Sequence, residues 1–439
     1  MKVNSVKKLC HYIWDLEAEM NLLDMQSNGV HIYQYLRMPI YYKLSESLGI
    51  LEKPVVNESR GISKYFSRLK FLSHSLLSVF NYFKIKNYDY CVIEHDRKVD
   101  IGVTKVDIYS HGFRKKISKK GSVISIYLPN GSAMEKNDSL NESFNFSLFF
   151  IISSIGAKIS SFIFKQNHSE TFEALEKRIF DDLGVRVKLS EMFHYYTLRF
   201  KIRKFFIEKL LKKIKPKDLF IVVAYSGRGD FVQVAKELGI NTVELQHGVI
   251  SRYHLGYSYP VEPKNPIMLP NSMYFWSRDW DLGSIMPSSI YKNYEALDCP
   301  FYKSETQLSE WLKNKSSRSI TVISQGALTE EIANYIYKNH KSFIGLTVNY
   351  KLHPSEYEKL RDSIGLKKLT SMKNVNIIKD TNLHKLMVQS HVVIGVFSTA
   401  LIEARMLGCR VIIIGLPGSE YFEYSSGYEK VSVDSGIVI

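Results

Sequence analysis

Cysteine is scarce in this chain, and the four cysteines that occur, Cys10, Cys91, Cys299 and Cys409, are far apart. No Cys-x-x-Cys pair is present, which argues against a cysteine zinc site and a disulfide framework. The first residues, MKVNSVKKLCHYIWDLEAEM, carry charges inside their apolar run and lack the pattern of a secretory leader. Reduced thiols and the lack of a leader predict a cytoplasmic protein.

The sequence also lacks the common nucleotide fingerprints. It has no Gly-rich dinucleotide motif and no P-loop lysine, so the motifs do not favour binding of NAD or ATP. No repeat of fixed period is visible. No recognisable nucleic-acid-binding motif occurs either, and we expect no nucleic-acid partner in spite of the basic composition.

Acidic side chains are the minority, because 44 Asp and Glu stand against 59 Lys and Arg, giving a formal net charge of +15. Such an excess favours an anionic partner, for example an acidic membrane leaflet or a phosphate-bearing substrate. Much of the charge lies in Lys201–Lys217, a helical pattern with Phe205 and Leu210 on its apolar side. Two interpretations stay open: the solvated face of a packed helix, or attachment to an anionic membrane surface.

One hydrophobic stretch, Phe144–Phe164, approaches the length of a membrane span. It contains Lys158, Gly156 and several serines, and no basic flank directly precedes it. We therefore expect a buried or interfacial helix here rather than a membrane span.

The chain is too long for one ordinary core, and its pattern predicts two α/β domains. Short apolar strands alternate with helices, which is typical of right-handed βαβ units and parallel sheets. The start of the chain has a mostly helical pattern, and the proline-rich Pro260–Pro270 is the expected linker. We expect a Rossmann-like domain with a helical extension at 1–262 and a second Rossmann-like domain at 263–439, their sheets facing a cleft.

The most informative unit is a strand, a Gly-bearing turn, a helix and a second strand that ends in Gln246-His247-Gly248. Ligands bind at the carboxyl ends of parallel strands, and His247 there suits a general base, with Gly248 allowing close approach. Asp230 on the turn is a second candidate for the base, unless it caps its helix. Glu244 is expected to point to the opposite face of the sheet. Further acceptor-binding candidates are Arg228, Gln246, Arg252 and His254.

The second half carries polar groups at several predicted strand ends. His353-Pro354 follows one strand and is preceded by Lys351, while Ser398-Thr399 lies between another strand and a helix. Free N–H groups, hydroxyls and the helix dipole make such a corner an anion site, although a serine N-cap without ligand has the same pattern. Glu403, one turn further, could meet a ribose hydroxyl or remain a solvated charge. The remaining donor-binding candidates are Gln325 and Gly326.

These motifs together resemble the GT-B glycosyltransferases, and most of all bacterial capsule and lipooligosaccharide enzymes that use CMP-activated sugars. In GT-B sialyltransferases a His-Pro motif and a Ser-Ser/Thr motif bind the CMP phosphate, and His353-Pro354 and Ser398-Thr399 match them here. Those enzymes carry an acidic base motif where this chain has Gln246-His247-Gly248. The His-Gly pair also resembles teichoic acid polymerases that use CDP-glycerol. The likeness covers roughly residues 89–415 and is specific only at these short motifs.

The resemblance implies a metal-independent transferase that moves a nonulosonic acid or Kdo from a CMP-sugar to a bacterial surface glycan or glycolipid. The CMP-sugar would be a co-substrate, and no resident cofactor or metal is expected, since Asp279-Trp280-Asp281 has the pattern of a solvated loop. His353 would stabilise the departing phosphate and His247 or Asp230 would take the acceptor proton. The alternatives are a CDP-polyol or other NDP-sugar transferase on the same fold, and a non-catalytic nucleotide- or acidic-glycan-binding protein. We expect the protein at the cytoplasmic side of the inner membrane, peripherally attached.

Overall fold

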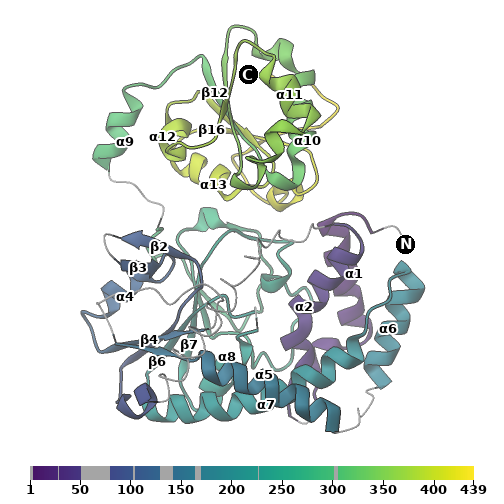
Figure 1. The fold of residues 1–439 in the computed structure, drawn as a ribbon, viewed down its shortest axis with the longest axis vertical. Coiled ribbons are helices and arrows are strands. Elements are labelled where there is room, and N and C mark those ends of the chain that lie inside the picture. Colours follow the sequence, from purple (N-terminus) through teal and green to yellow (C-terminus); the bar gives the residue numbers. More distant parts are fainter. Residues whose placement is uncertain are drawn as a thin grey trace, which may run out of the picture.

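Two parallel sheets organise the molecule, the second sheet standing above the first in Figure 1. The computed structural model describes residues 3–27, 29–50, 80–101, 104–128, 142–163, 170–225, 227–300 and 305–439. Within these ranges each sheet is covered by helices and forms a Rossmann-like unit. The expected α/β architecture of two such units is confirmed.

The first sheet contains seven short strands: β1 (Tyr90–Ile93), β4 (Val123–Tyr127), β5 (Glu142–Asn145), β6 (Asp218–Val222), β7 (Asn241–Leu245), β9 (Ser272–Tyr274) and β11 (Tyr291–Asn293). Their order is β11-β9-β7-β6-β1-β4-β5, and all neighbouring pairs are parallel. Most of their residues are buried, as is usual for parallel strands covered on both faces. Two small ribbons accompany the sheet: β2 (Lys98–Ile101) with β3 (Thr104–Asp107), antiparallel, and β8 (Ile250–Ser251) with β10 (Asp281–Leu282).

The helices of the first unit are α1 (Val6–Glu19), α2 (Ile32–Ser47), α4 (His111–Ile117), α5 (Ser147–Ile163), α6 (Glu170–Leu183), α7 (Leu189–Ile214) and α8 (Gly229–Glu237). The predicted helical start is thus confirmed for the described residues, and residues 51–79 lie outside them. None of the described helices combines the length and the apolar character that crossing a membrane requires.

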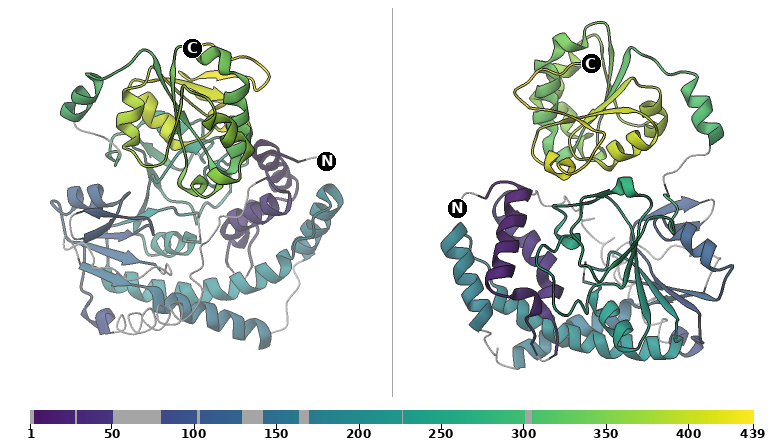
Figure 2. Two further views of the ribbon diagram at one scale, coloured as in Figure 1. Left: turned by 45° about the horizontal axis from the view of Figure 1, so that its top comes forward. Right: turned by 180° about the vertical axis from the view of Figure 1, so that it is seen from behind.

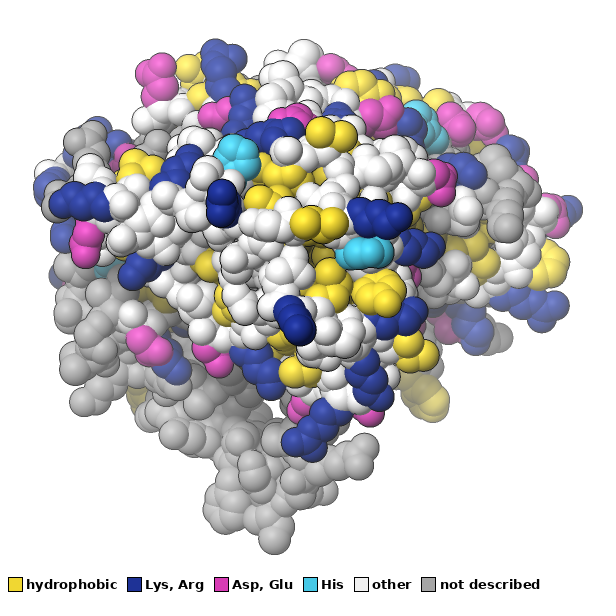
Figure 3. Space-filling view, turned by 90° about the horizontal axis from the view of Figure 1, so that it is seen from above, with side chains coloured by type: hydrophobic (Ala, Val, Ile, Leu, Met, Phe, Trp, Pro, Cys, Tyr) yellow, Lys and Arg dark blue, Asp and Glu magenta, His cyan; other side chains and the backbone are white. Residues whose placement is uncertain are grey.

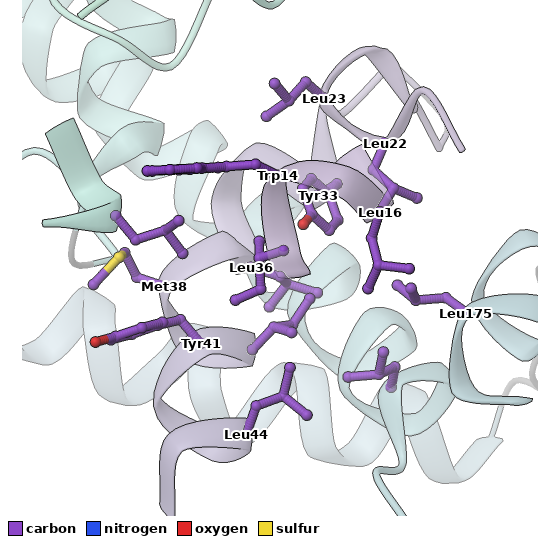
Figure 4. Packing of buried hydrophobic residues seen from close by; sticks show 14 of the residues in the cluster. Trp14, Leu16, Leu22, Leu23, Tyr33, Leu36, Met38, Tyr41, Leu44 and Leu175 are labelled. Atoms are coloured by element: carbon purple, nitrogen blue, oxygen red, sulfur yellow. The ribbon is translucent and has the colours of Figure 1, made fainter. Parts of the chain in front are cut away.

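Helices α1 and α2 pack against α6 and α7 through a large apolar cluster that includes Trp14, Leu36 and Tyr41 (Figure 4). A buried ion pair crosses this cluster, with Arg37 Nε 2.6 Å from Glu17 Oε1. The same guanidinium also donates to the carbonyl oxygens of Leu255 and Ser258. The two helices therefore hold the 255–258 segment in place, and this segment belongs to the site described below.

The second sheet consists of β12 (Ser319–Ile323), β13 (Thr347–Lys351), β14 (Val375–Ile378), β15 (Val392–Gly395), β16 (Arg410–Ile414) and β17 (Glu429–Val431). These strands are parallel in the order β14-β13-β12-β15-β16-β17. The helices around them are α9 (Glu305–Leu312), α10 (Thr329–Lys338), α11 (Ile364–Thr370), α12 (Leu383–Val388) and α13 (Thr399–Met406).

The expected domain boundary after residue 262 is wrong, because the strands that follow it belong to the first sheet. β9 pairs with β7 and β11 pairs with β9, so the first unit extends to at least residue 293. The proline-rich stretch is therefore a crossing within the first unit. The second unit follows this first unit, and its first described helix, α9, lies beside α12 (Figure 1). Sequence could not show this, since the partner of a short strand is chosen by distant residues.

Side chains of the first unit contact the last part of the chain directly. In both views of Figure 2 the start of the chain, in dark purple, lies on the side of the first unit next to the second unit. Lys7 Nζ lies 2.7 Å from Glu423 Oε1, and Tyr253 O–H donates to Glu423 Oε2 at 3.1 Å. Trp280, buried in the first unit, donates from Nε1 to Met406 Sδ of α13 at 2.9 Å. A pocket of about 450 Å³ opens between the start of α1 and the carboxyl ends of β16 and β17, with Lys7 and Lys430 in its wall.

Candidate functional site

The first sheet reverses its strand order between β1 and β6, since the chain continues from β1 to β4 and β5 but from β6 to β7, β9 and β11. Ligands of open α/β sheets bind beyond the carboxyl ends of the strands at such a reversal. β1 leads there into His95, and β6 leads into Val223. Val223 has a φ of 62°. A positive φ is energetically costly for a β-branched residue, and such strained backbone conformations cluster at functional sites. Strand order and backbone strain therefore mark the same place.

His247 follows β7, and two tyrosine hydroxyls hold its ring. Tyr257 Oη lies 3.2 Å from Nδ1 and Tyr225 Oη lies 3.4 Å from Nε2. Tyr225 Oη also lies 3.2 Å from His254 Nε2, and the His95 ring stacks on that of His247 with centroids 6.1 Å apart. Burial and then the charges of His254 and His95 lower the pKa of His247 well below its usual value. The ring is therefore neutral at pH 7 and has a lone pair to accept a proton.

A buried carboxyl group completes this cluster. Tyr257 O–H donates to Glu244 Oε1 at 2.6 Å, and the Ala224 N–H donates to the same oxygen at 3.1 Å. Burial raises the pKa of Glu244 to about 7. The expectation that Glu244 points away from His247 is wrong, because the hydroxyl of Tyr257 joins the two side chains.

This chain of contacts selects one tautomer of His247. When Glu244 is ionised, Tyr257 donates its proton to the carboxylate and its oxygen can accept only from Nδ1–H of the imidazole. Nε2 then carries the lone pair. The hydrogen-bond partners of His247 therefore determine which ring nitrogen carries the proton.

Arg228, one of the predicted acceptor-binding residues, lies in the same cluster. Its guanidinium donates to the carbonyl of Val222 at the end of β6, and Nη2 lies 3.8 Å from Asp96 Oδ2. Arg228 is nearly buried, and it is one of the charges that lower the pKa of His95 and His247. Its positive charge thus lies at the strand reversal, beside the carboxylate of Asp96.

The other predicted residues of the first unit have separate places. His254 belongs to the cluster through Tyr225, as described, whereas the guanidinium of Arg252 lies 4.4 Å from the ring centroid of Tyr424 in the second unit. The amide of Gln246 donates to the Gly248 carbonyl at 2.8 Å and accepts from the Trp276 N–H at 2.8 Å. Gln246 is fully buried, so it braces the loop and its proposed contact with an acceptor is not supported. A Cβ at Gly248 would have no neighbour within 4 Å, so the backbone is open there.

Asp230 is not placed to act as the base. Its side chain is fully buried on α8, with Arg203 of α7 providing the partner: Arg203 Nε lies 2.8 Å from Oδ2 and Nη2 donates to Oδ1 at 3.1 Å. Both oxygens therefore face a guanidinium that also donates to the Tyr35 hydroxyl and the Gly227 carbonyl. The structure contradicts the catalytic interpretation, and Asp230 has a structural role.

Sequence reasoning missed three members of the cluster: His95, Tyr225 and Tyr257. His95 follows the apolar strand β1 as His247 follows β7, so its position at a strand end was a usable sign. The tyrosines gave no such sign, because the chain has 28 of them and only the folded loops select these two.

The second sheet reverses its order between β12 and β15, since β13 and β14 lie on one side and β16 and β17 on the other. Gln325 follows β12, and its side-chain oxygen accepts from the Phe397 N–H beyond β15 at 3.1 Å. Gly326 abuts Ser355 so closely that a Cβ there would overlap the serine hydroxyl. The loops after β12, β13 and β15 are therefore in contact at this reversal, as the predicted nucleotide site requires.

His353 and Ser398 lie at this edge with one strand between them. β13 and β15 are both neighbours of β12, so the two strands are separated by about 10 Å. His353 is exposed, and its Nδ1 accepts from the Ser355 N–H at 3.2 Å, which turns Nε2 away from its own loop. Pro354 begins a short 3-10 turn there. Lys351 donates from Nζ to the Leu352 carbonyl at 2.6 Å, and burial lowers its pKa.

Ser398 is the N-cap of α13, and its Oγ accepts from the Ala400 N–H at 3.3 Å. Thr399 opens the helix, so the first-turn N–H groups of α13 lie at the strand reversal. Glu403 pairs with His384 of α12, with Oε2 2.7 Å from Nε2. Its expected contact with a ribose is not supported, because it links two helices.

Aromatic residues beyond both reversals pack against one apolar cluster. The ring of Phe397 lies 6.0 Å from that of Tyr421, and Phe397, Tyr421 and Tyr225 all pack against the same apolar cluster. Tyr225 in turn bonds to His247. Residues that follow strands of both sheets therefore contribute to this cluster. Among the described ranges, no three His, Cys, Asp or Glu side chains are grouped as a metal site would need.

No protein-family model matches the sequence, and no curated protein matches it. The solved structures that are similar include a spinosyn rhamnosyltransferase, SpnG, with 12% identity and a TM-score of 0.42 over 77% of this chain and 83% of that one. Another is MurG of Acinetobacter baumannii, with 8% identity and a TM-score of 0.45 over 79% and 87%. A third is UDP-GlcNAc 2-epimerase of Neisseria meningitidis bound to UDP-GlcNAc, with 12% identity and a TM-score of 0.43 over 79% and 87%. Similarity at this level concerns overall architecture, and we transfer no residue role from it.

Proposed function

We propose that this protein is a glycosyltransferase of the GT-B type, with the donor nucleotide on the second unit and the acceptor on the first. The observation that carries the proposal is the imidazole of His247, held by two tyrosine hydroxyls at the strand reversal of the first sheet. The second reversal, with His353, Ser398 and Gln325, offers donors for a phosphate. Placing a proton acceptor and an anion site on facing sheet edges suits transfer between two bound substrates.

In the proposed reaction the acceptor hydroxyl gives its proton to Nε2 of His247 as its oxygen bonds to the anomeric carbon of the donor. The bond between that carbon and the phosphate oxygen breaks, and the electron pair leaves with the nucleotide. His353 and the first turn of α13 stabilise the growing phosphate charge. Glu244 acts through Tyr257 by holding Nδ1–H, so it is a positioning residue.

The donor we propose is a CMP-activated nonulosonic acid or Kdo, on the likeness of His353-Pro354 and Ser398-Thr399 to CMP-phosphate motifs. A CDP-polyol donor is the second candidate, and His247 favours it because the acidic base motif of CMP-sugar enzymes is replaced by His-Gly here. Three similar solved structures bear names with UDP-GlcNAc, which adds UDP-sugars to the donors worth testing. The acceptor would be a bacterial surface glycan or glycolipid, and the protein would work at the cytoplasmic side of the membrane.

Isothermal titration with CMP, CDP, UMP, UDP and GDP tests the nucleotide, beside a transfer assay with the donor that corresponds to the tightest ligand. We expect His353→Ala to weaken nucleotide binding at least tenfold. His247→Ala should bind the nucleotide like the wild type and transfer no sugar. His340→Ala, an exposed histidine of the second unit, is the matched control. Equal loss of binding in both site variants, or no binding of any nucleotide by the wild type, would contradict the proposal.

We also propose peripheral attachment to an anionic membrane surface. The apolar side of Lys201–Lys217 is only partly available for this, because Leu210 and Leu211 are buried in the core of the first unit while Phe205 is exposed. The net charge of +15 remains in favour of an anionic surface.

A further inference from the structure

Exposed apolar side chains are concentrated on one group of helices. Among the described residues eighteen large hydrophobic side chains are exposed, and eight of these lie on α5, on α7 and on the helical segment 80–84. Single exposed hydrophobic residues need no explanation, but a contiguous group of them marks an interaction surface. The eight residues are Phe80, Phe83, Ile152, Ile155, Ile159, Phe162, Ile163 and Phe205.

Helix α5 is apolar on two sides. Ile152, Ile155, Ile159 and Phe162 recur every three or four residues, so they follow one side of the helix, and Phe162 is 93% exposed. Buried residues, Ala157 among them, form the side that packs into the protein. A surface helix of a globular protein normally has a polar outer side. The outer side of α5 is therefore suited to contact with an apolar partner.

The three helical segments form one continuous surface. The rings of Phe149 in α5 and Phe206 in α7 are 4.8 Å apart, and Lys213 Nζ donates to the Phe83 carbonyl at 3.1 Å. Figure 1 shows α5 and α7 along the side of the first unit that is turned away from the second unit. We call this surface the α5 face; it comprises the eight exposed apolar residues and the exposed lysines Lys158, Lys201 and Lys209. Lys212 beside them pairs with Glu208.

Positive charge lies beside the apolar side chains of the α5 face. Lys158 is on α5 itself, and Lys209 Nζ lies 5.7 Å from the ring centroid of Phe205. The upper side of the second unit, seen in Figure 3, carries basic, acidic and hydrophobic side chains together. Apolar residues beside lysines are the pattern of helices that lie in the interface of an anionic bilayer.

We propose that the α5 face docks on an anionic lipid bilayer, with the apolar residues of α5 entering the headgroup region and the lysines contacting lipid phosphates. A second copy of the chain fits less well, because a two-fold contact would place lysines against lysines. The inference gives a location to the membrane attachment proposed above, and it does not depend on sugar transfer. Bound in this way, the protein would hold its second unit on the side away from the lipid.

Co-sedimentation with vesicles tests the proposal, using phosphatidylcholine alone and phosphatidylcholine mixed with phosphatidylglycerol. We expect the wild type to sediment with the anionic vesicles, less so as salt is added, and the triple variant Ile155→Ser, Ile159→Ser, Phe162→Ser to bind at least tenfold more weakly. Phe162→Ser alone should weaken binding measurably, and a Tm and nucleotide affinity like those of the wild type show that both variants fold. A matched control replaces three exposed apolar residues of the second unit, Ile344→Ser, Ile364→Ser and Val438→Ser.

The outcomes separate this surface from the broader proposals. Equal binding by the wild type and by both α5 variants would overturn the α5 face as the docking surface. No sedimentation of the wild type with anionic vesicles would overturn membrane attachment as well, while the nucleotide titration above would still stand. The wild type could instead form concentration-dependent dimers that the α5 variants do not form, while vesicle binding stays unchanged. That result would show that a second copy of the chain covers this face, and it would overturn the proposal.

Discussion

Two ion pairs of similar chemistry join α7 to α8, and they differ in burial. Arg203 and Asp230 have side chains that are 0% exposed, with 2.8 Å between Nε and Oδ2. Lys204 and Glu237 are 2.7 Å apart, with side chains 32% and 37% exposed. The sequence offered Asp230 as a base, whereas this geometry makes it a structural partner of a buried guanidinium. The two pairs therefore provide a matched comparison of the two roles.

We predict that Asp230→Ala lowers the free energy of unfolding by about 3–5 kcal/mol, because it leaves a buried guanidinium without its carboxylate. Glu237→Ala should cost less than about 1 kcal/mol, since its pair is partly solvated. The double variant Arg203→Met, Asp230→Leu should recover much of the loss, because no charge stays buried. Urea unfolding followed by circular dichroism at pH 7 measures all three. Equal costs for the two single variants, or a cost below about 1 kcal/mol for Asp230→Ala, would refute the buried-pair reasoning.

Two further predictions concern the cluster around the imidazoles. Burial lowers the pKa of His254 to about 4, so below pH 6.5 the unfolded chain binds a proton that the folded chain does not. The stability of the wild type relative to His254→Gln should fall by about 1–2 kcal/mol between pH 7 and pH 5 in urea unfolding, and a constant difference would contradict the shift. A Cβ at Gly256 would lie 2.7 Å from the Tyr225 ring, whereas one at Gly248 meets nothing within 4 Å. Gly256→Ala should therefore lower the Tm and Gly248→Ala should leave it unchanged, and the reverse order would show that the ring packs elsewhere.

Tertiary structure decided which side chains lie beside the predicted site residues. Tyr257 reaches His247 from a loop that α2 holds, because Arg37 donates to the carbonyls of Leu255 and Ser258, whereas Tyr225 reaches it from the loop after β6. These partners are far apart in sequence and have no common spacing. For the same reason the ion pair of Asp230 and the strand partners of β9 and β11 could not be predicted.

The sequence alone determined the α/β class, the strand–helix alternation and the residues that follow each strand. Periodicity and strand direction are local properties, and parallel strands carry their carboxyl ends to one edge, so His247, His353 and Ser398 could be assigned to sheet edges in advance. Only the tertiary structure decided strand order, the domain boundary and the outward-facing apolar side of α5. The reason is that the hydrophobic pattern indicates which residues favour burial, whereas packing between segments that are distant in the sequence decides which of these residues are buried.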